Sequence, residues 1–154
     1  MKKRNIFLSI LVVLLLFTLT GCGKKNVATG EDFKSLFEEK GYTIYDVTSQ
    51  FSSLGVIESA TIAQSNNGYQ VEFYVLKDQG EAVAMFNTNS ATFETYKGNT
   101  SSGTTSSANN YSTYSLTSSG YYMYLCQVDN TLLYVKIPDA YKNEVKKVVK
   151  QFGY

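Results

Sequence analysis

Residues 56–77 have the alternating apolar pattern of a β-hairpin. Asn67-Gly68 lies between two runs in which every second residue is apolar, and this dipeptide is a strong signal for a tight turn. With Asn67-Gly68 at the centre of the turn, Ile62 pairs with Phe73 and Ala60 pairs with Val75. The pattern therefore predicts two antiparallel strands that share an apolar face.

Residues 121–138 have the pattern of a second hairpin, with Asp129-Asn130 at its turn. In this register Cys126 pairs with Leu133 and Tyr124 pairs with Val135. Cys126 then lies on an apolar face, which favours a buried core residue over the alternative of a reactive or dimer-forming thiol. Pro138 ends the second strand because proline cannot donate a hydrogen bond to a neighbouring strand.

After each hairpin, apolar residues recur at the spacing of a helix. A shorter pattern of the same kind covers residues 31–40, before the first hairpin. Asp78 and Glu81 are three residues apart, as at the start of a capped helix, and the polar run 87–90 predicts a break within that helix. Residues 141–152 form the most amphipathic segment, with valines on one face and lysines on the other. We expect the lysine face to be solvated; contact with anionic lipid or a wall polymer is the alternative.

These elements predict a two-layer α+β domain over residues 31–154. Two β-hairpin–helix units form one antiparallel sheet with the helices on one face, and the N-terminal helix is an addition. The layout resembles that of TATA-box-binding-protein-like or cystatin-like folds, a likeness that implies no function. Residues 99–110 are uncharged and rich in Ser, Thr and Asn, which predicts a flexible loop; a partner-binding or glycosylated loop is the alternative.

The second predicted hairpin is apolar on its other face as well, although a sheet face in contact with water is usually more polar. The N-terminal helix covers this face, or the face is an exposed aromatic surface that marks a binding site. In the second case the candidate binding residues are Tyr74, Tyr121, Met123 and Tyr134.

The N-terminal segment has the form of a secretory signal. Three cations in residues 1–4 precede residues 6–19, which are uncharged and too short to span a membrane easily; a permanent helical anchor is the alternative. The run ends Leu19-Thr20-Gly21-Cys22, which resembles the lipobox of bacterial lipoproteins. The resemblance implies that residues 1–21 are a signal peptide cleaved before Cys22, and that the Cys22 sulfur carries diacylglycerol. Residues 22–30 are then a short tether to the membrane.

Composition excludes several function classes. The chain has no histidine, which removes the commonest general base and metal ligand, so we expect no catalytic residue, no metal site and no cofactor. The chain after residue 21 has 11 Lys and Arg residues and 13 Asp and Glu residues, which gives it a net charge of −2. A domain with this balance is not expected to bind nucleic acid.

The lipobox and this composition resemble the small uncharacterised lipoproteins of Gram-positive bacteria, especially Firmicutes. That resemblance implies a lipid-anchored protein on the extracytoplasmic face of the cell membrane. We expect a non-catalytic protein that binds an envelope protein or a cell-wall component. One alternative is a carrier of a small saccharide or peptide, which needs a concave pocket. Another is a hydrolase that uses two facing carboxylates.

Overall fold

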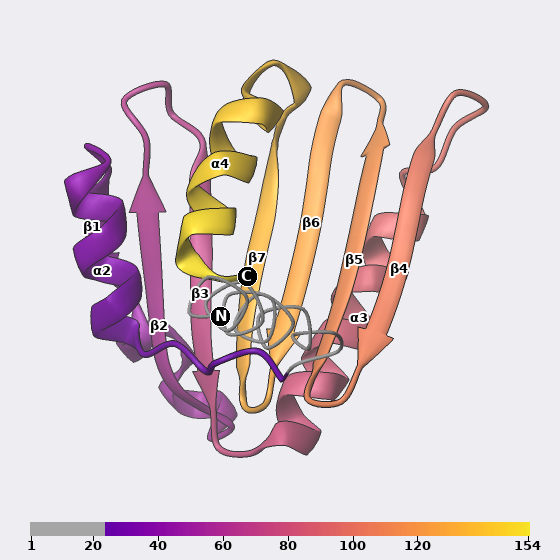
Figure 1. The fold of residues 1–154 in the computed structure, drawn as a ribbon. Coiled ribbons are helices and arrows are strands. Elements are labelled where there is room, and N and C mark those ends of the chain that lie inside the picture. Colours follow the sequence, from indigo (N-terminus) through magenta and orange to yellow (C-terminus); the bar gives the residue numbers. More distant parts are fainter. Residues whose placement is uncertain (1–23) are drawn as a thin grey trace, which may run out of the picture.

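The computed structural model describes residues 24–154, so the predicted signal peptide 1–21 and the predicted lipidation site Cys22 lie outside the described residues (Figure 1). Within this part of the chain, seven antiparallel strands form one sheet in the order β1-β2-β3-β7-β6-β5-β4. The strands are β1 (Thr43–Asp46), β2 (Ile57–Gln64), β3 (Gln70–Leu76), β4 (Ser102–Ala108), β5 (Tyr111–Ser118), β6 (Tyr121–Val128) and β7 (Thr131–Pro138). The helices are α2 (Gly30–Glu39), α3 (Gln79–Glu94) and α4 (Lys142–Phe152), with 3-10 turns η1 (Thr48–Leu54) and η2 (Asp139–Tyr141). The predicted α+β class with an antiparallel sheet is confirmed.

The helices are divided between the two faces of the sheet, which corrects the expectation that they share one face (Figure 1). Helices α2 and α4 pack through Phe33 and Val149 against one face, where Phe73 and Leu133 are buried. Helix α3 packs on the opposite face, and its buried residues are Ala82, Phe86 and Phe93. Strands β6 and β7 are apolar on both faces, so each face needs a cover to keep those side chains from water.

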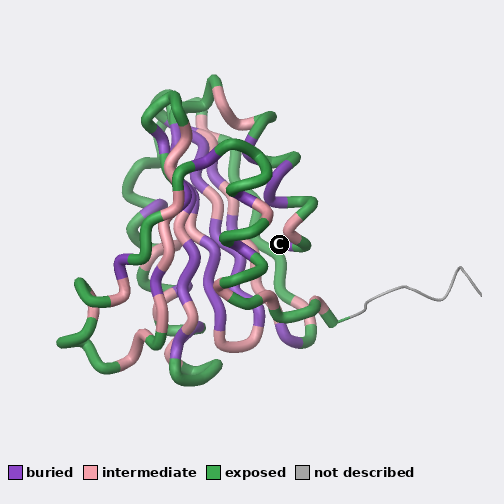
Figure 2. Tube along the Cα trace, turned by 90° about the vertical axis from the view of Figure 1, so that its left-hand side faces the viewer, coloured by how far each residue is buried: buried purple, intermediate pink, exposed green. Residues whose placement is uncertain are grey.

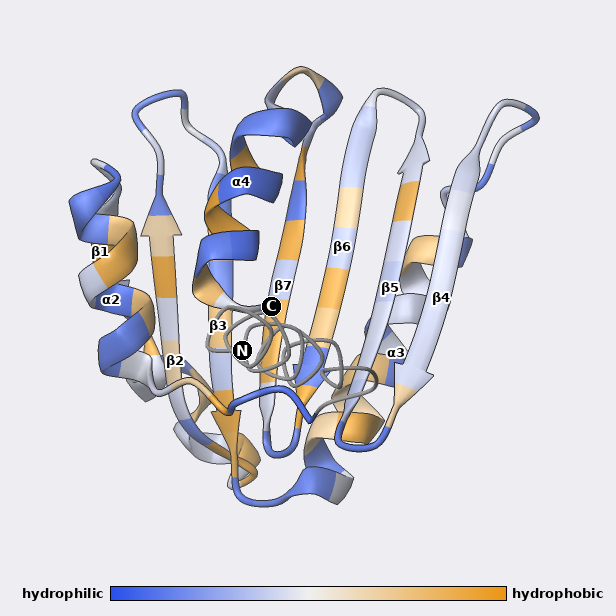
Figure 3. Ribbon diagram, in the orientation of Figure 1, coloured by the Kyte–Doolittle hydropathy of each residue, from blue (hydrophilic) through white to orange (hydrophobic). Residues whose placement is uncertain are grey.

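The side view shows how burial is distributed along the chain (Figure 2). Buried positions follow the central strands, and exposed positions lie on the outer sides of the helices and at the turns. Figure 3 shows the same division along α4, whose apolar residues face the sheet and whose lysines face outward. The expected solvated lysine face is therefore consistent with the exposure of Lys146, Lys147 and Lys150.

The two hairpins are joined into one sheet by β3 and β7, whose pairing places Phe73 beside Leu133. The register of the β6–β7 hairpin is as predicted: Cys126 pairs with Leu133 and Tyr124 with Val135. Cys126 is fully buried, as expected of a core residue.

The register of the β2–β3 hairpin is shifted by one residue from the prediction, because Ile62 pairs with Glu72 instead of Phe73. The loop is longer than a two-residue turn: the Gly68 amide donates to Ser65 O at 3.0 Å, and the Ser65 amide donates to Tyr69 O at 2.9 Å. Gly68 has φ of +82°, as in a turn followed by a left-handed glycine. A one-residue shift moves side chains to the opposite face, so Ile62 lies on the α3 face of the sheet.

The flexible loop expected over residues 99–110 is corrected by the structure, in which residues 102–108 form the edge strand β4. All seven residues pair with β5, from Ser102 opposite Thr117 to Ala108 opposite Tyr111. The strand has almost no buried side chains, so backbone hydrogen bonding and the extended preference of threonine account for it.

Helix α3 runs without the break expected at residues 87–90. Thr88 Oγ1 donates to Ala84 O at 3.0 Å, and Asn89 Nδ2 donates to Met85 O at 2.8 Å. These polar side chains bond to carbonyls one turn earlier and do not compete for the backbone in another conformation. The predicted helix start is confirmed, since Asp78 accepts from the Glu81 amide at 2.9 Å.

Residues 24–29 belong to the predicted tether, yet they lie against the domain instead of hanging free of it. Asn110 and Lys25 exchange two hydrogen bonds, and the Tyr154 hydroxyl accepts from the Ala28 amide at 3.2 Å. Only the part of the tether before Lys24 lies outside the described residues.

We expect Phe33→Ala to lower the free energy of unfolding by about 3–5 kcal/mol, because it leaves a cavity among stacked rings. The Phe33 ring lies 4.3 Å from Phe37 and 5.3 Å from Phe73, centre to centre. Tyr45→Ala, at a position that is 47% exposed, is the matched control and should change stability by less than about 1 kcal/mol. Urea unfolding measures both, and equal losses in the two variants would contradict this description of the core.

Candidate binding surface

The α3 face of the sheet is only partly covered. Helix α3 crosses this face behind β5 and β6 (Figure 1). On the same face, at β3, Phe51 of η1 packs against Tyr74. Towards the β2–β3 turn, the side chains on this face of β3 and β7 are polar or half-buried. They include Glu72 and its partner Tyr134. We use the name tyrosine surface for Glu72, Tyr134, Lys136, Tyr96 and Tyr121.

The exposed part of the tyrosine surface is organised by the Lys136 ammonium. Its Nζ lies 3.9 Å from the centre of the Tyr96 ring and 5.6 Å from the centre of the Tyr121 ring. It also donates a hydrogen bond to the Tyr96 hydroxyl at 2.7 Å. Cation–π attraction therefore holds two rings around one charge, although Tyr96 and Tyr121 remain 36% and 42% exposed.

At its inner border, the tyrosine surface meets side chains that donate hydrogen bonds to the Glu72 carboxylate. The Tyr74 hydroxyl and Gln70 Nε2 both donate to Glu72, the second at 2.8 Å. Tyr134 packs on Phe93 with ring centres 5.2 Å apart, and burial raises the pKa of its hydroxyl to about 12. Burial also raises the pKa of Tyr74, with Glu72 adding to the shift. Both phenols are protonated at neutral pH and can donate hydrogen bonds.

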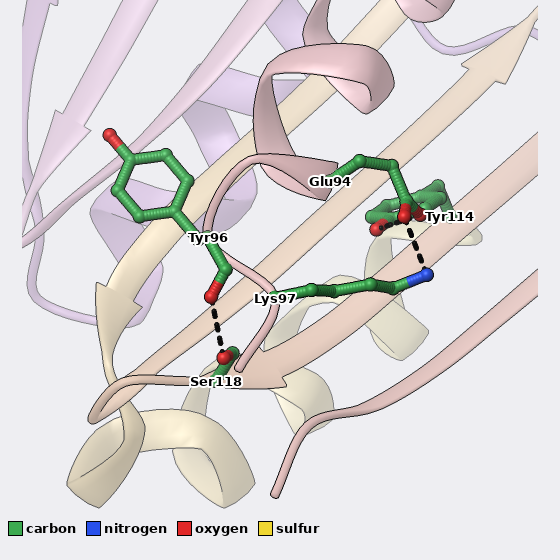
Figure 4. A network of polar contacts seen from close by, with 5 residues as sticks. All are labelled: Glu94, Tyr96, Lys97, Tyr114 and Ser118. Carbon is green, nitrogen blue, oxygen red and sulfur yellow. Dashed lines mark hydrogen bonds and ion pairs between the residues drawn. The ribbon is translucent and has the colours of Figure 1, made fainter. Parts of the chain in front are cut away.

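Polar contacts with β5 hold the loop that carries Tyr96 (Figure 4). Ser118 Oγ donates to the Tyr96 carbonyl at 2.7 Å. Glu94, the last residue of α3, forms an ion pair with Lys97 in the loop. Glu94 also accepts a hydrogen bond from the Tyr114 hydroxyl at 2.6 Å. The end of α3 and the start of the loop are thus tied to β5, which places the Tyr96 ring next to Lys136.

The four predicted binding residues have different environments. Met123 is fully buried under α3 and Tyr74 is 6% exposed, so neither presents a surface, in line with the alternative in which this face is covered. Tyr134 is half-buried and Tyr121 is exposed. The cover expected from the N-terminal helix comes instead from α3 and η1.

Tyr96 and Lys136 were not among the predicted binding residues. A signal for Lys136 was present, since it alternates with Tyr134 along β7 and must share its face. Tyr96 had no such signal, because its place depends on where α3 ends and how the following loop returns.

The chemistry of the tyrosine surface suits polar ligands with flat apolar faces. Exposed aromatic rings offer stacking area, and the neighbouring ammonium, carboxylate and phenol groups bond to hydroxyls or amides. In residues 24–154 no group of three metal-ligating side chains lies together. The helices of this same region are too short or too polar to span a membrane.

Comparisons with known proteins do not identify a family for this chain. No protein family matches the chain, and no curated protein matches it either. The crystal structure of a GTP binding regulator from Thermotoga maritima matches with a TM-score of 0.49 and 18% sequence identity, over 82% of this chain and 88% of that chain. A likeness of this degree carries no inference about what the present chain binds.

We expect Cys126 to resist thiol reagents in the folded domain. It is fully buried, and burial raises the pKa of its thiol to about 11, so little reactive thiolate exists at neutral pH. A version that begins at Lys24 should react with a chromogenic disulfide only when urea unfolds it, whereas its Tyr121→Cys variant should react at once. Rapid labelling of the folded parent would contradict the core role.

We expect the pKa of Glu94 to lie below its usual value, because its carboxylate accepts hydrogen bonds from Lys97 and then Tyr114. A lowered folded pKa means that this contribution to stability is present above the unfolded pKa, near 4.5, and is lost as pH falls through the folded value. Lys97→Ala should raise the pKa of Glu94, as measured by NMR titration of its side-chain carboxyl carbon. Lys136→Ala should leave it unchanged, and an unmoved Glu94 in the Lys97 variant would disprove the pairing.

Proposed function

We propose that this chain is a lipid-anchored lipoprotein on the extracytoplasmic face of the cell membrane. Its support is the Leu19-Thr20-Gly21-Cys22 pattern after a basic and an apolar segment, which predicts lipidation of Cys22. Two acyl chains on one cysteine are enough for stable anchoring, whereas a single chain binds weakly. The membrane is then one partner of the protein, through the lipid on Cys22.

We further propose that the anchored domain is a non-catalytic binding module for a cell-wall component or another envelope protein. The observation that carries this proposal is the pair of exposed rings, Tyr96 and Tyr121, held around Lys136. Tyrosines on an ordered surface provide contact area at low cost in conformational entropy. Sugar rings with amide and carboxylate groups match this chemistry best, because they have apolar faces to stack and polar groups to bond.

A binding assay with purified wall fragments and solubilised envelope proteins tests this proposal. The version that begins at Lys24 keeps both cores, since their buried residues all lie between Phe33 and Tyr154. We expect Tyr96→Ser/Tyr121→Ser to weaken capture at least about tenfold, equivalent to roughly 1.4 kcal/mol.

Tyr45→Ser is the matched control, because Tyr45 is another exposed tyrosine but lies on the edge strand β1, which β2, β3 and β7 separate from β6. It should bind like the parent, and thermal unfolding should show that both variants fold. Specific capture that is equally strong in the double variant would place the binding site elsewhere. An absence of any capture would contradict the binding role.

A further inference from the structure

One end of the sheet is held to the chain that leads towards Cys22. Asn110, in the β4–β5 turn, accepts from the Lys25 amide at 3.0 Å and donates to the Lys25 carbonyl at 2.9 Å. The Lys25 ammonium donates to the Gly153 carbonyl at 2.6 Å. Asn110 is 7% exposed, so its amide is committed to these bonds and to Asp129. The start of the described chain is therefore docked on the domain.

The distance from this docked segment to the lipidation site is short. Only three peptide units separate Cys22 from Lys25, and an extended chain of that length spans about 10 Å. A lipid on Cys22 would therefore keep Asn110 near the headgroups, with no room for the domain to turn over freely.

At the end of the sheet that contains Asn110, hydrogen bonds join each turn to the next. The Asp129 amide donates to the Asn110 carbonyl at 2.8 Å, and Asn130 Nδ2 donates to the Leu76 carbonyl at 2.9 Å. The backbone amide of Lys77, the residue after Leu76, donates to the Val56 carbonyl at 3.0 Å. We use the name proximal end for these hydrogen-bonded turns together with the docked residues 24–28. In Figure 1 it is the lower edge of the sheet.

The exposed apolar side chains near the proximal end are aliphatic, whereas Tyr96 and Tyr121 at the other end of the strands are aromatic. Among residues 24–154, the exposed large aliphatic side chains are Val27, Leu54 and Val83. Val27 lies in the docked segment, Leu54 precedes the Val56 carbonyl by two residues, and Val83 lines the same groove as Asn110. Tyr96 and Tyr121 lie at the other end of the strands, where β6 begins and β7 ends.

We propose that the proximal end rests on the phospholipid surface, with Val27, Leu54 and Val83 at the depth of the headgroups. This inference depends on the proposed lipidation of Cys22 and goes beyond it, because lipidation alone does not set an orientation. Lys24 and Lys25 add attraction to anionic lipid. The tyrosine surface then faces away from the bilayer, where it is open to wall polymers and envelope proteins.

Depth-dependent fluorescence quenching tests this orientation. The full chain is produced in a lipoprotein-processing host and reconstituted in vesicles of phosphatidylcholine and phosphatidylglycerol that carry a headgroup nitroxide. Leu54→Cys, Val83→Cys and Tyr121→Cys each receive the same fluorophore, since Cys126 is buried. The strands separate the two ends by roughly 25 Å, so quenching at Leu54 and Val83 should exceed quenching at Tyr121 at least about threefold.

An insertion of about eight Gly and Ser residues between Gly23 and Lys24 is the control, because it lengthens the chain without touching the docked segment. We expect it to reduce the difference in quenching between the two ends. Equal quenching at Leu54, Val83 and Tyr121 in vesicle-bound, lipidated protein would overturn the orientation and leave the lipoprotein proposal intact. Protein that does not float with vesicles and has no lipid by mass would overturn both.

Discussion

Both faces of the β6–β7 hairpin are apolar, and the rest of the structure depends on covering them. On one face Leu133 and Val135 are fully buried under α2 and α4, and on the other Leu132 and Leu125 are fully buried under α3. A sheet with a single helical layer would leave one of these sets in water, at a cost of about 1.5–3 kcal/mol for each large side chain. The first hairpin–helix unit therefore places its helix behind the sheet, and the second places its helix in front.

The tyrosine surface is a consequence of how far α3 reaches. The helix covers β6 and the neighbouring parts of β5 and β7, and beyond its end the α3 face carries polar and aromatic residues instead of aliphatic ones. Lys136, Glu72 and the tyrosine hydroxyls satisfy one another there, so the surface is ordered without being buried. The opposite end of the same strands is closed by turns and by the docked residues 24–28. One sheet thus separates the end that holds residues 24–28 from the end that carries Tyr96, Tyr121 and Lys136.

The parts of the fold with an apolar rhythm could be predicted from the sequence. The β6–β7 register follows from the positions that bury Cys126 and Leu133, and α4 follows from its valine stripe. The β2–β3 register could not be settled in this way, because Gly68 fits either a two-residue turn or the left-handed position after a longer one. Strand β4 has no apolar pattern at all, since pairing with β5 through the backbone is what orders it. The candidate site was predictable at Tyr121 and Tyr134 but not at Tyr96, whose position depends on tertiary contacts with Ser118 and Lys136.

We propose that a lipid on Cys22 holds this domain at the membrane, next to the docked residues 24–28. The most direct measurement is the intact mass of the protein extracted from membranes of a lipoprotein-processing host, with proteolysis to isolate its N-terminal peptide. We expect this peptide to begin at Cys22 and to carry the added mass of a diacylglyceryl group. We expect the Cys22→Ser variant to retain the signal peptide and to carry no lipid. An unmodified N-terminus at Met1, or cleavage at another residue with a free Cys22 thiol, would contradict this proposal.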